Sequence, residues 1–131
     1  MKKVLTRIKN EVYYYKDFKK IIGIHKNISG DVSEIRGDVS EIRGDVSGIR
    51  GNVSEITGNV SEITGDVSGL RGDVSWISGN VSEIRGNVSW IRGDVSGLRG
   101  NVSGLRGDVD LCEITEEERR EGISIEKLIL E

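Results

Sequence analysis

The chain has 131 residues, with 18 glycines, no proline, one cysteine and a net charge of -3. Only 35% of the residues are hydrophobic, which argues against a compact globule with a thick core and favours a thin core repeated along a stack. The lone cysteine excludes an internal disulfide, and charges interrupt every apolar run that a signal peptide or a spanning helix would need. We therefore expect a cytoplasmic protein by default, with leaderless export or a virion-associated location left open.

Charge divides the chain into three segments. Residues 1–29 carry eight Lys or Arg and two acidic residues, a net +6. Residues 30–107 carry eight basic and eleven acidic residues, a net -3, and residues 108–131 carry three and nine, a net -6. This pattern predicts a basic N-terminal cap with a degenerate first repeat, a central repeat domain and an acidic C-terminal cap.

The first 22 residues are predicted to form a basic amphipathic helix, because apolar residues recur every three or four positions. Its apolar face comprises Leu5, Ile8, Val12, Tyr15, Phe18 and Ile22. We expect this helix to cap the first repeat unit; binding to a membrane or to nucleic acid is the alternative. The next stretch, GIHKNIS, is a decayed repeat with Gly23 and Ile28 in register.

Eleven heptads of the form Gly-(Asp/Asn)-Val-Ser-x-(Ile/Leu)-x then run from Gly30 to Arg106. We number the positions of the heptad one to seven. Positions one, three, four and six are nearly invariant, which indicates a constrained environment. Position five varies among Glu, Gly and Trp, and position seven is mostly Arg, which indicates contact with water.

A period of seven is also typical of a coiled coil, but the composition excludes it. Gly, Asp or Asn, Val, Ser and Ile in every heptad would cost a helix roughly 2–3 kcal/mol per heptad. Collagen is excluded because glycine does not occupy every third position and proline is absent.

A β-strand fits the repeat. The segment Ser-x-Ile-x alternates as a strand does, with Ser and Ile predicted to point inward, while Gly-Asp or Gly-Asn forms the turn and Val closes the corner. Such units must stack, which predicts a parallel β-solenoid whose identical residues form ladders about 4.8 Å apart. Two heptads per coil give a two-sided roll, and three give a triangular coil. Trp76 and Trp90 are 14 residues apart, so a two-sided roll would stack them, and we favour that form.

The repeat resembles two groups of proteins. Read as Ser-x-Ile-x-Gly-(Asp/Asn)-Val, it is similar to the half-coil of the left-handed β-roll heads of trimeric autotransporter adhesins, with Ile where that family often has Ala. The chain also resembles the poorly characterised tandem heptapeptide-repeat proteins of microbes and phages that carry the motif GDVSGLRG. That second resemblance covers residues 30–131 and implies a β-solenoid with no established activity.

The last segment is predicted to cap the roll. Asp110 replaces the repeat serine, and Cys112 is predicted to take the inward position of Ile. Thr115 and Glu118 form a capping-box pattern for a helix that Gly122 would end. The final SIEKLILE is expected to form a short helix or a docking strand.

No catalytic, cofactor or metal site emerges from the repeat. The one histidine, His25, has no convergent partner in sequence, and Cys112 is more typical of a small core residue than of a nucleophile. The Asp of position two exchanges freely with Asn, which a calcium site would not tolerate. We therefore expect a protein that is not an enzyme and needs no cofactor.

Two functions fit this sequence. The first is a rigid structural or interaction protein that presents a regular surface or assembles with itself end to end, because the charges of its two ends are opposite. The candidate end contacts are Lys2, Lys3, Arg7, Lys19, Lys20, Glu116, Glu117 and Glu118. The second is recognition of a polymer, a nucleic acid or a glycan, by an exposed face of aromatic and basic residues. The candidate face comprises Trp76, Trp90, Arg71, Arg85, Arg92 and Arg99.

Overall fold

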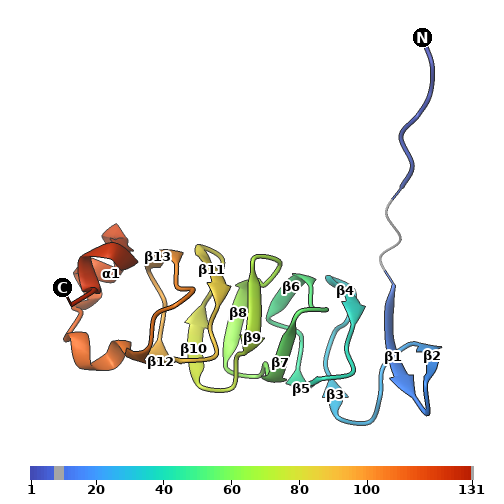
Figure 1. Cartoon of the computed structure of the whole chain (residues 1–131), viewed down its shortest axis with the longest axis horizontal. Helices are drawn as coiled ribbons and strands as arrows, with labels where there is room; N and C mark the ends of the chain where they lie inside the picture. Colours follow the sequence, from blue (N-terminus) through green and yellow to red (C-terminus); the bar gives the residue numbers. More distant parts are fainter. Residues whose placement is uncertain (8–10, 131) are drawn as a thin grey trace.

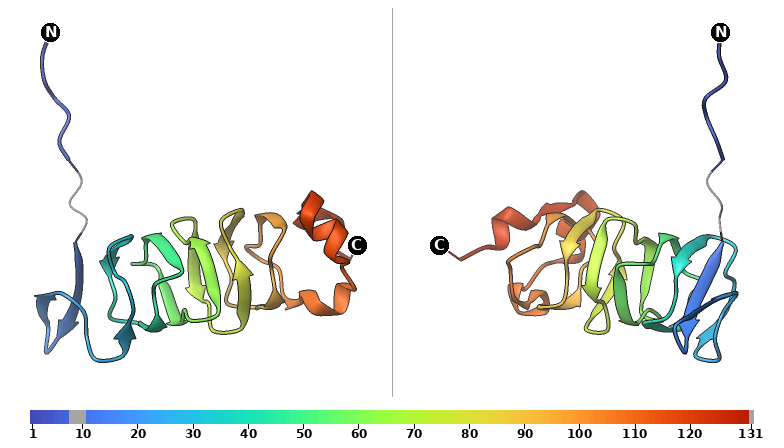
Figure 2. Two further views of the ribbon diagram at one scale, coloured as in Figure 1. Left: turned by 180° about the vertical axis from the view of Figure 1, so that it is seen from behind. Right: turned by 45° about the vertical axis from the view of Figure 1, so that its right-hand side comes forward.

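The chain forms a two-sided parallel β-solenoid of about five turns (Figure 1). The computed structural model describes residues 1–7 and 11–130. Successive heptads contribute one strand each, alternately to an eight-stranded sheet, sheet I, and a seven-stranded sheet, sheet II. The two-sided roll is thus confirmed and the triangular coil is wrong. Figure 2 shows the roll as a rod with different structures at its two ends.

Within each sheet, the strands of the repeat pair in parallel with the strand two places along the chain. Sheet I contains β1 (Val12–Lys16), β2 (Lys19–Ile22), β4 (Ile35–Asp38), β6 (Ile49–Asn52), β8 (Ile63–Asp66), β10 (Ile77–Asn80), β12 (Ile91–Asp94) and β14 (Gly107–Asp108). Sheet II contains β3 (Ile28–Ser29), β5 (Ile42–Asp45), β7 (Ile56–Asn59), β9 (Leu70–Asp73), β11 (Ile84–Asn87), β13 (Leu98–Asn101) and β15 (Ile123–Ser124).

The strand and the turn occupy different parts of the heptad from those predicted. Each full repeat strand begins at the Ile or Leu of position six and ends at the Asp or Asn of position two, so Gly lies within the strand. The turn is made by Val-Ser-x, and the N–H of Ile63 donates to the carbonyl of Val60 across it at 3.3 Å. The predicted inward serine is therefore wrong, because no polar residue in the described part of the chain is buried.

The hydroxyl of each such serine links one coil to the next. Asn59 shows the arrangement: its side-chain oxygen accepts from the N–H of Ser61 at 2.9 Å, as predicted for a residue that bonds its own turn. Its own N–H donates to the hydroxyl of Ser75 in the following coil at 3.0 Å. The same pair of bonds recurs along the roll, which explains why position four is serine and why Asp and Asn are interchangeable at position two.

These turn bonds predict how the fold responds to acid. A hydrogen bond from the N–H of Ser68 is the main cause that lowers the pKa of Asp66, and Asp31 and Asp45 have lowered pKa values for the same reason. A carboxyl whose pKa is lowered by folding stabilises the fold above its unfolded pKa of about 3.9, and that contribution is lost as the pH falls through the folded pKa. We expect the melting temperature to be flat near neutral pH and to fall below about pH 4.

Exchange of these three aspartates for asparagine should weaken the acid dependence, because Asn keeps the turn bond without titrating. Thermal unfolding over a series of pH values measures it. The matched control removes three exposed position-five charges by the substitutions Glu34→Gln, Glu41→Gln and Glu55→Gln. Equal acid profiles for the two triple variants would contradict the assignment of acid sensitivity to the turns.

Neighbouring strands are offset by 16 residues, although the sequence repeats every 14. Ile35 lies beside Gly51, and Ile56 lies beside Gly72. One turn therefore takes about 16 residues, and the predicted ladders of identical residues are wrong. A large inward side chain lies next to a glycine, which lets the narrow interior hold isoleucines from both sheets.

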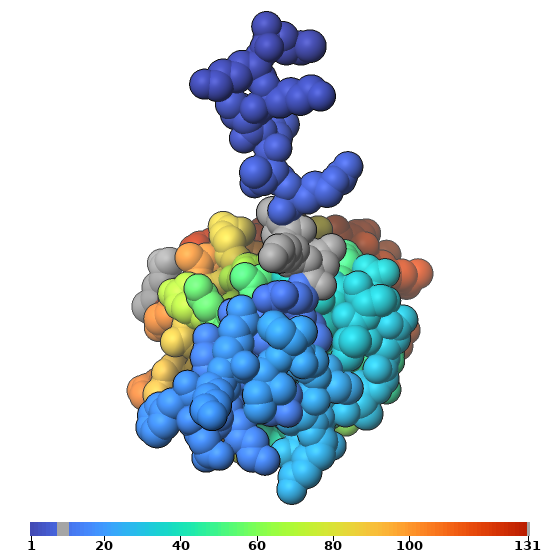
Figure 3. All heavy atoms as spheres, turned by 90° about the vertical axis from the view of Figure 1, so that its right-hand side faces the viewer, coloured from blue at the N-terminus to red at the C-terminus, as the bar shows by residue number. Residues whose placement is uncertain are grey.

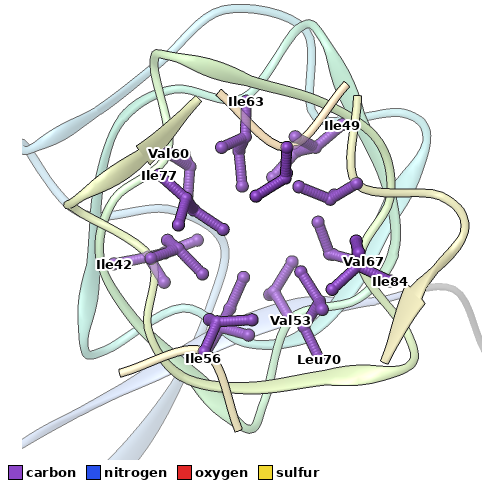
Figure 4. Packing of buried hydrophobic residues seen from close by; sticks show 14 of the residues in the cluster. Ile42, Ile49, Val53, Ile56, Val60, Ile63, Val67, Leu70, Ile77 and Ile84 are labelled. Atoms are coloured by element: carbon purple, nitrogen blue, oxygen red, sulfur yellow. The ribbon is translucent and has the colours of Figure 1, made fainter. Parts of the chain in front are cut away.

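The core is a single row of valine and isoleucine or leucine side chains along the axis of the roll. Position three is fully buried through the centre of the roll, as at Val60 with 0% exposure, and position six is buried to the same degree. Figure 4 looks along this core: the labelled residues point inward from both sheets, and Ile49, Ile63 and Ile77 succeed one another around the axis. This displacement is the expected consequence of a turn longer than the repeat.

The N-terminal segment is a β-hairpin, so the predicted helix is wrong. Strands β1 and β2 are antiparallel, and β1 pairs in parallel with β4 to extend sheet I. The turn residues Asp17 and Phe18 both have positive φ, 53° and 64°, the pattern of a two-residue hairpin turn. Val12 and Tyr14 pack against the core, whereas Tyr15, Phe18 and Ile22 of the predicted apolar face are exposed.

Other parts of the N-terminal prediction have mixed outcomes. Residues 1–7 have no regular secondary structure and their side chains are exposed, while Ile8 lies outside the described residues. Ile28 is buried and pairs beside Gly44 as the decayed repeat predicted. His25 ties this unit to the roll: its Nδ1 accepts from the N–H of Asn27 at 3.2 Å, so its Nε2 donates to the carbonyl of Val39 at 2.8 Å.

The C-terminal segment covers the other end of the roll. It consists of a 3-10 turn (Val109–Cys112), helix α1 (Glu116–Glu121), strand β15 and a second 3-10 turn (Ile125–Leu128). The capping box of Thr115 and Glu118 is confirmed, and β15 pairs with β13 as a docking strand.

Two details of this cap concern residues singled out in the sequence. Asp110 takes over the role of the repeat serine, because its carboxylate accepts from the N–H of Asp94 at 3.1 Å. Cys112 is exposed, so its predicted inward position is wrong; Ile125 fills the end of the core instead. No helix within the described residues has the length and apolar character needed to cross a membrane.

Candidate interaction surfaces

Two tryptophans share one face of sheet I in successive coils. Trp76 and Trp90 occupy position five, in the turns that lead into β10 and β12, and their side chains are 58% and 70% exposed. Other coils carry Glu or Gly at this position and have the same strands. The tryptophans are therefore not required to build the repeat.

The offset of 16 residues decides what lies beside each tryptophan. Because Ile77 pairs with Gly93, Arg92 lies beside Trp76, and its guanidinium carbon is 5.1 Å from the centre of the indole ring. Because Ile91 pairs with Gly107, Arg106 lies beside Trp90. The predicted stacking of one tryptophan on the other is therefore wrong; tryptophan and arginine alternate instead.

These side chains border a shallow hollow of about 590 Å³ on sheet I. We call this surface the Trp–Arg face and define it by Trp76, Trp90, Arg92, Arg106 and Asp108, all of which line the hollow. Position in the register also places Asp108 next to Arg92. The face thus combines two indole rings with both donors and acceptors of hydrogen bonds.

Only part of the predicted face comes together in this way. Trp76, Trp90 and Arg92 lie on sheet I, whereas the other three predicted residues belong to strands of sheet II. Those three are Arg71, Arg85 and Arg99. Arg71 instead donates to the hydroxyl of Ser103 at 3.0 Å. Arg106 was not predicted, although adding 16 to the number of Trp90 would have found it.

The N-terminal hairpin forms a basic end with exposed apolar side chains. Phe18 is fully exposed at the tip of the turn, and Lys16 and Lys19 are cross-strand partners on either side of it. Like charges in that arrangement destabilise a hairpin. Lys20 pairs with Glu11 at 3.1 Å and lies 4.2 Å from the ring centre of Tyr13. Figure 3 shows the hairpin spread over this end of the roll.

The C-terminal cap forms an acidic end with an apolar hollow. The hollow of about 270 Å³ is bordered by Leu105, Val109, Ile125 and Leu128 among others. The predicted contact residues of this end are Glu116, Glu117 and Glu118, which occupy the exposed first turn of α1. Glu118 is engaged in the capping box, so Glu116 and Glu117 are the better candidates for an outside contact.

Arg119 fastens the acidic cap to the roll. Its guanidinium donates to the carbonyl oxygens of Asp94 and Ser96, both at 2.7 Å, and lies 3.9 Å from the carboxylate of Asp94. This side chain is therefore structural, and the exposed glutamates of α1 are held in a fixed position relative to the last coils.

Comparison with known proteins leaves the fold as the only level of relationship. No protein-family model matches the chain, and neither a curated protein nor a solved structure matches it.

Proposed function

We propose that this protein is a non-enzymatic structural protein, a rigid β-solenoid that assembles with itself end to end. The motif GDVSGLRG supports grouping it with the tandem heptapeptide-repeat proteins, whose fold would be the same. The observation that carries the proposal is the placement of exposed apolar side chains. Between residues 30 and 106, Trp76 and Trp90 are the only exposed large hydrophobic residues, and all the others in the described chain lie in the end segments.

The apolar side chains of the two ends are matched in form. Phe18 projects from the tip of the N-terminal hairpin with a positive φ, which a bulky residue adopts at a cost in free energy. The opposite end offers an apolar hollow beside the exposed Leu111 and Leu130. A second copy of the chain is the occupant that we propose for this hollow, because it brings an exposed aromatic residue to it.

The charges of the ends favour the same arrangement. The N-terminal segment carries a net +6 and the C-terminal segment a net -6. About five coils spaced about 4.8 Å apart separate them by about 24 Å, which exceeds the physiological Debye length of about 8 Å. The two ends therefore attract their counterparts on other molecules more than they neutralise each other.

Contact between two different ends is heterologous and propagates into a filament unless it closes into a ring. Assembly should consequently be favoured at low salt and reduced at high salt. Sedimentation velocity and negative-stain microscopy at the two salt concentrations measure it. A protein that remains monomeric at low salt would contradict the proposal.

Charge reversal at each end tests the contact directly. The pair Lys16→Glu and Lys19→Glu should abolish assembly, and so should the pair Glu116→Lys and Glu117→Lys, because each leaves two ends of like charge. The first pair is matched for stability, since it replaces one like-charge pair by another across the hairpin. The chain with all four changes has both ends reversed and should assemble again.

Controls separate the ends from the faces. The substitutions Trp76→Glu and Trp90→Glu restore a residue common at position five and should leave assembly unchanged. Phe18→Ser should weaken assembly at every salt concentration, since it removes the apolar part of the contact. Loss of assembly in the tryptophan variant, with no effect of the four charge reversals, would place the contact on the face of the roll instead.

A further inference from the structure

We propose that the Trp–Arg face binds a neutral, β-1,4-linked glycan chain. This binding site is separate from the two ends, and the inference does not depend on end-to-end assembly. It starts from the fact that both tryptophans of the chain are exposed on one face, in successive coils, where the repeat tolerates Glu or Gly. Exposed indole rings that the fold does not need indicate contact with a partner.

The platform that carries the rings is rigid. Each tryptophan immediately precedes a strand held on both sides in sheet I, β10 by β8 and β12, and β12 by β10 and β14. The guanidinium of Arg92 packs against the ring of Trp76 and restricts it. Little conformational freedom is therefore lost when a ligand binds.

The spacing of the rings suits successive rings of a polymer. Trp90 is one strand further along the sheet than Trp76 and two residues back along it, because the register is 16 and the separation in sequence is 14. Strand spacing and rise per residue then place the two α-carbons about 8 Å apart. A β-1,4-linked chain is an extended, flat ribbon whose sugar rings present C–H groups to an aromatic surface.

The charges of the face favour a neutral ligand over nucleic acid. Arg92 and Arg106 are offset by Asp94 and Asp108 on the same two strands, and the whole chain has a net charge of -3. Nucleic-acid binding draws its affinity from an excess of positive charge, which this face lacks. Sugar hydroxyls both donate and accept hydrogen bonds, so they can pair with guanidinium and carboxylate groups alike.

Intrinsic tryptophan fluorescence reports this face alone, since the chain has no other tryptophan. We expect cellohexaose or chitohexaose to change the emission saturably, at a salt concentration high enough to suppress end-to-end assembly. By calorimetry, Trp76→Glu and Trp90→Glu should each lower the affinity at least tenfold. Arg92→Gln should lower it several-fold, because it removes both the support of Trp76 and a hydrogen-bond donor.

Arg85→Gln is the matched control, since it removes the same group from position seven of sheet II and should leave affinity unchanged. Circular dichroism of each variant verifies the fold. Failure of both oligosaccharides to bind would overturn the proposal, and so would binding that survives both tryptophan substitutions. Tighter binding of an oligodeoxythymidylate, weakening steeply with salt, would also overturn it by assigning the face to single-stranded nucleic acid.

Discussion

Replacing Gly58 by alanine is expected to lower the free energy of unfolding by about 2–6 kcal/mol. Gly58 is buried in β7 with a φ of 98°, a backbone conformation that is strained for any residue with a β-carbon. The place where that carbon would stand is taken by Ser75 and Asp73 of the next coil. Backbone strain and overpacking therefore add, and neither a hydroxyl in a turn bond nor the backbone beneath it can move cheaply.

Gly69 provides the matched control for this prediction. It occupies position five, its φ is not positive, and an added β-carbon would meet Arg85 at 3.4 Å, an ordinary contact. Gly69→Ala should change the free energy of unfolding by no more than about 0.5 kcal/mol. Urea denaturation followed by circular dichroism compares the two variants, and similar losses for both would contradict the role assigned to position one.

The architecture of the roll could be predicted because the repeat restricts it so strongly. Gly, Asp and Ser in every heptad exclude a helix on propensity alone, and a unit with one apolar side must stack. The burial of Val at position three also followed from its invariance within the chain. The spacing of Trp76 and Trp90 favoured two heptads per coil for a reason that proved wrong, since the rings do not stack.

The limits of strand and turn could not be read from the period. A repeat of seven fixes how often a strand occurs, and leaves open where in the heptad it begins. Gly-Asp is a common turn pair, yet here both residues lie in the strand and the turn follows at Val-Ser. The decisive interactions are between coils: the serine hydroxyl accepts from the preceding coil, and the same group leaves no room for a side chain at position one.

The N-terminal segment shows the same ambiguity on a shorter scale. Spacings of three and four predicted a helix, while the run Val-Tyr-Tyr-Tyr has the β-branched and aromatic character of a strand. The turn at Asp17–Phe18 lacks the glycine that usually marks such a hairpin, so the local signal was missing. The open edge of β4 decides the outcome, because a strand can pair with it and a helix cannot.

The candidate face was half predicted for a related reason. Exposed tryptophans could be recognised from their variable position, but their neighbours depend on the register. A register of 14 would have placed Trp90 beside Trp76, whereas the observed 16 places Arg92 there and sends Arg85 to the other sheet. Register depends on packing a large side chain against glycine, a property of two coils that no single heptad displays.

A cavity in the middle of the roll is expected to do more than lower stability. Ile63 is 1% exposed and lies in β8, which pairs with β6 on one side and β10 on the other. Ile63→Ala should cost about 2–5 kcal/mol, the range for such truncations in a well-packed core. Its exposed neighbour Thr64 is the control, and Thr64→Ala should cost less than about 0.5 kcal/mol.

The consequence for cooperativity follows from the one-dimensional build of the roll. Each coil contacts only its neighbours, so stability is nearly a sum of coil terms and interface terms, and a weakened central interface uncouples the two halves. Tryptophan fluorescence reports the C-terminal half, where Trp76 and Trp90 lie, while circular dichroism reports all strands. In the unaltered chain the two urea transitions should coincide, and in Ile63→Ala they should separate. Ile125→Ala, the same truncation at the acidic end, should shift the fluorescence transition without dividing the rest of the roll. Coincident transitions in Ile63→Ala, at a loss of several kcal/mol, would show that the coils unfold as one unit and that coupling extends beyond nearest neighbours.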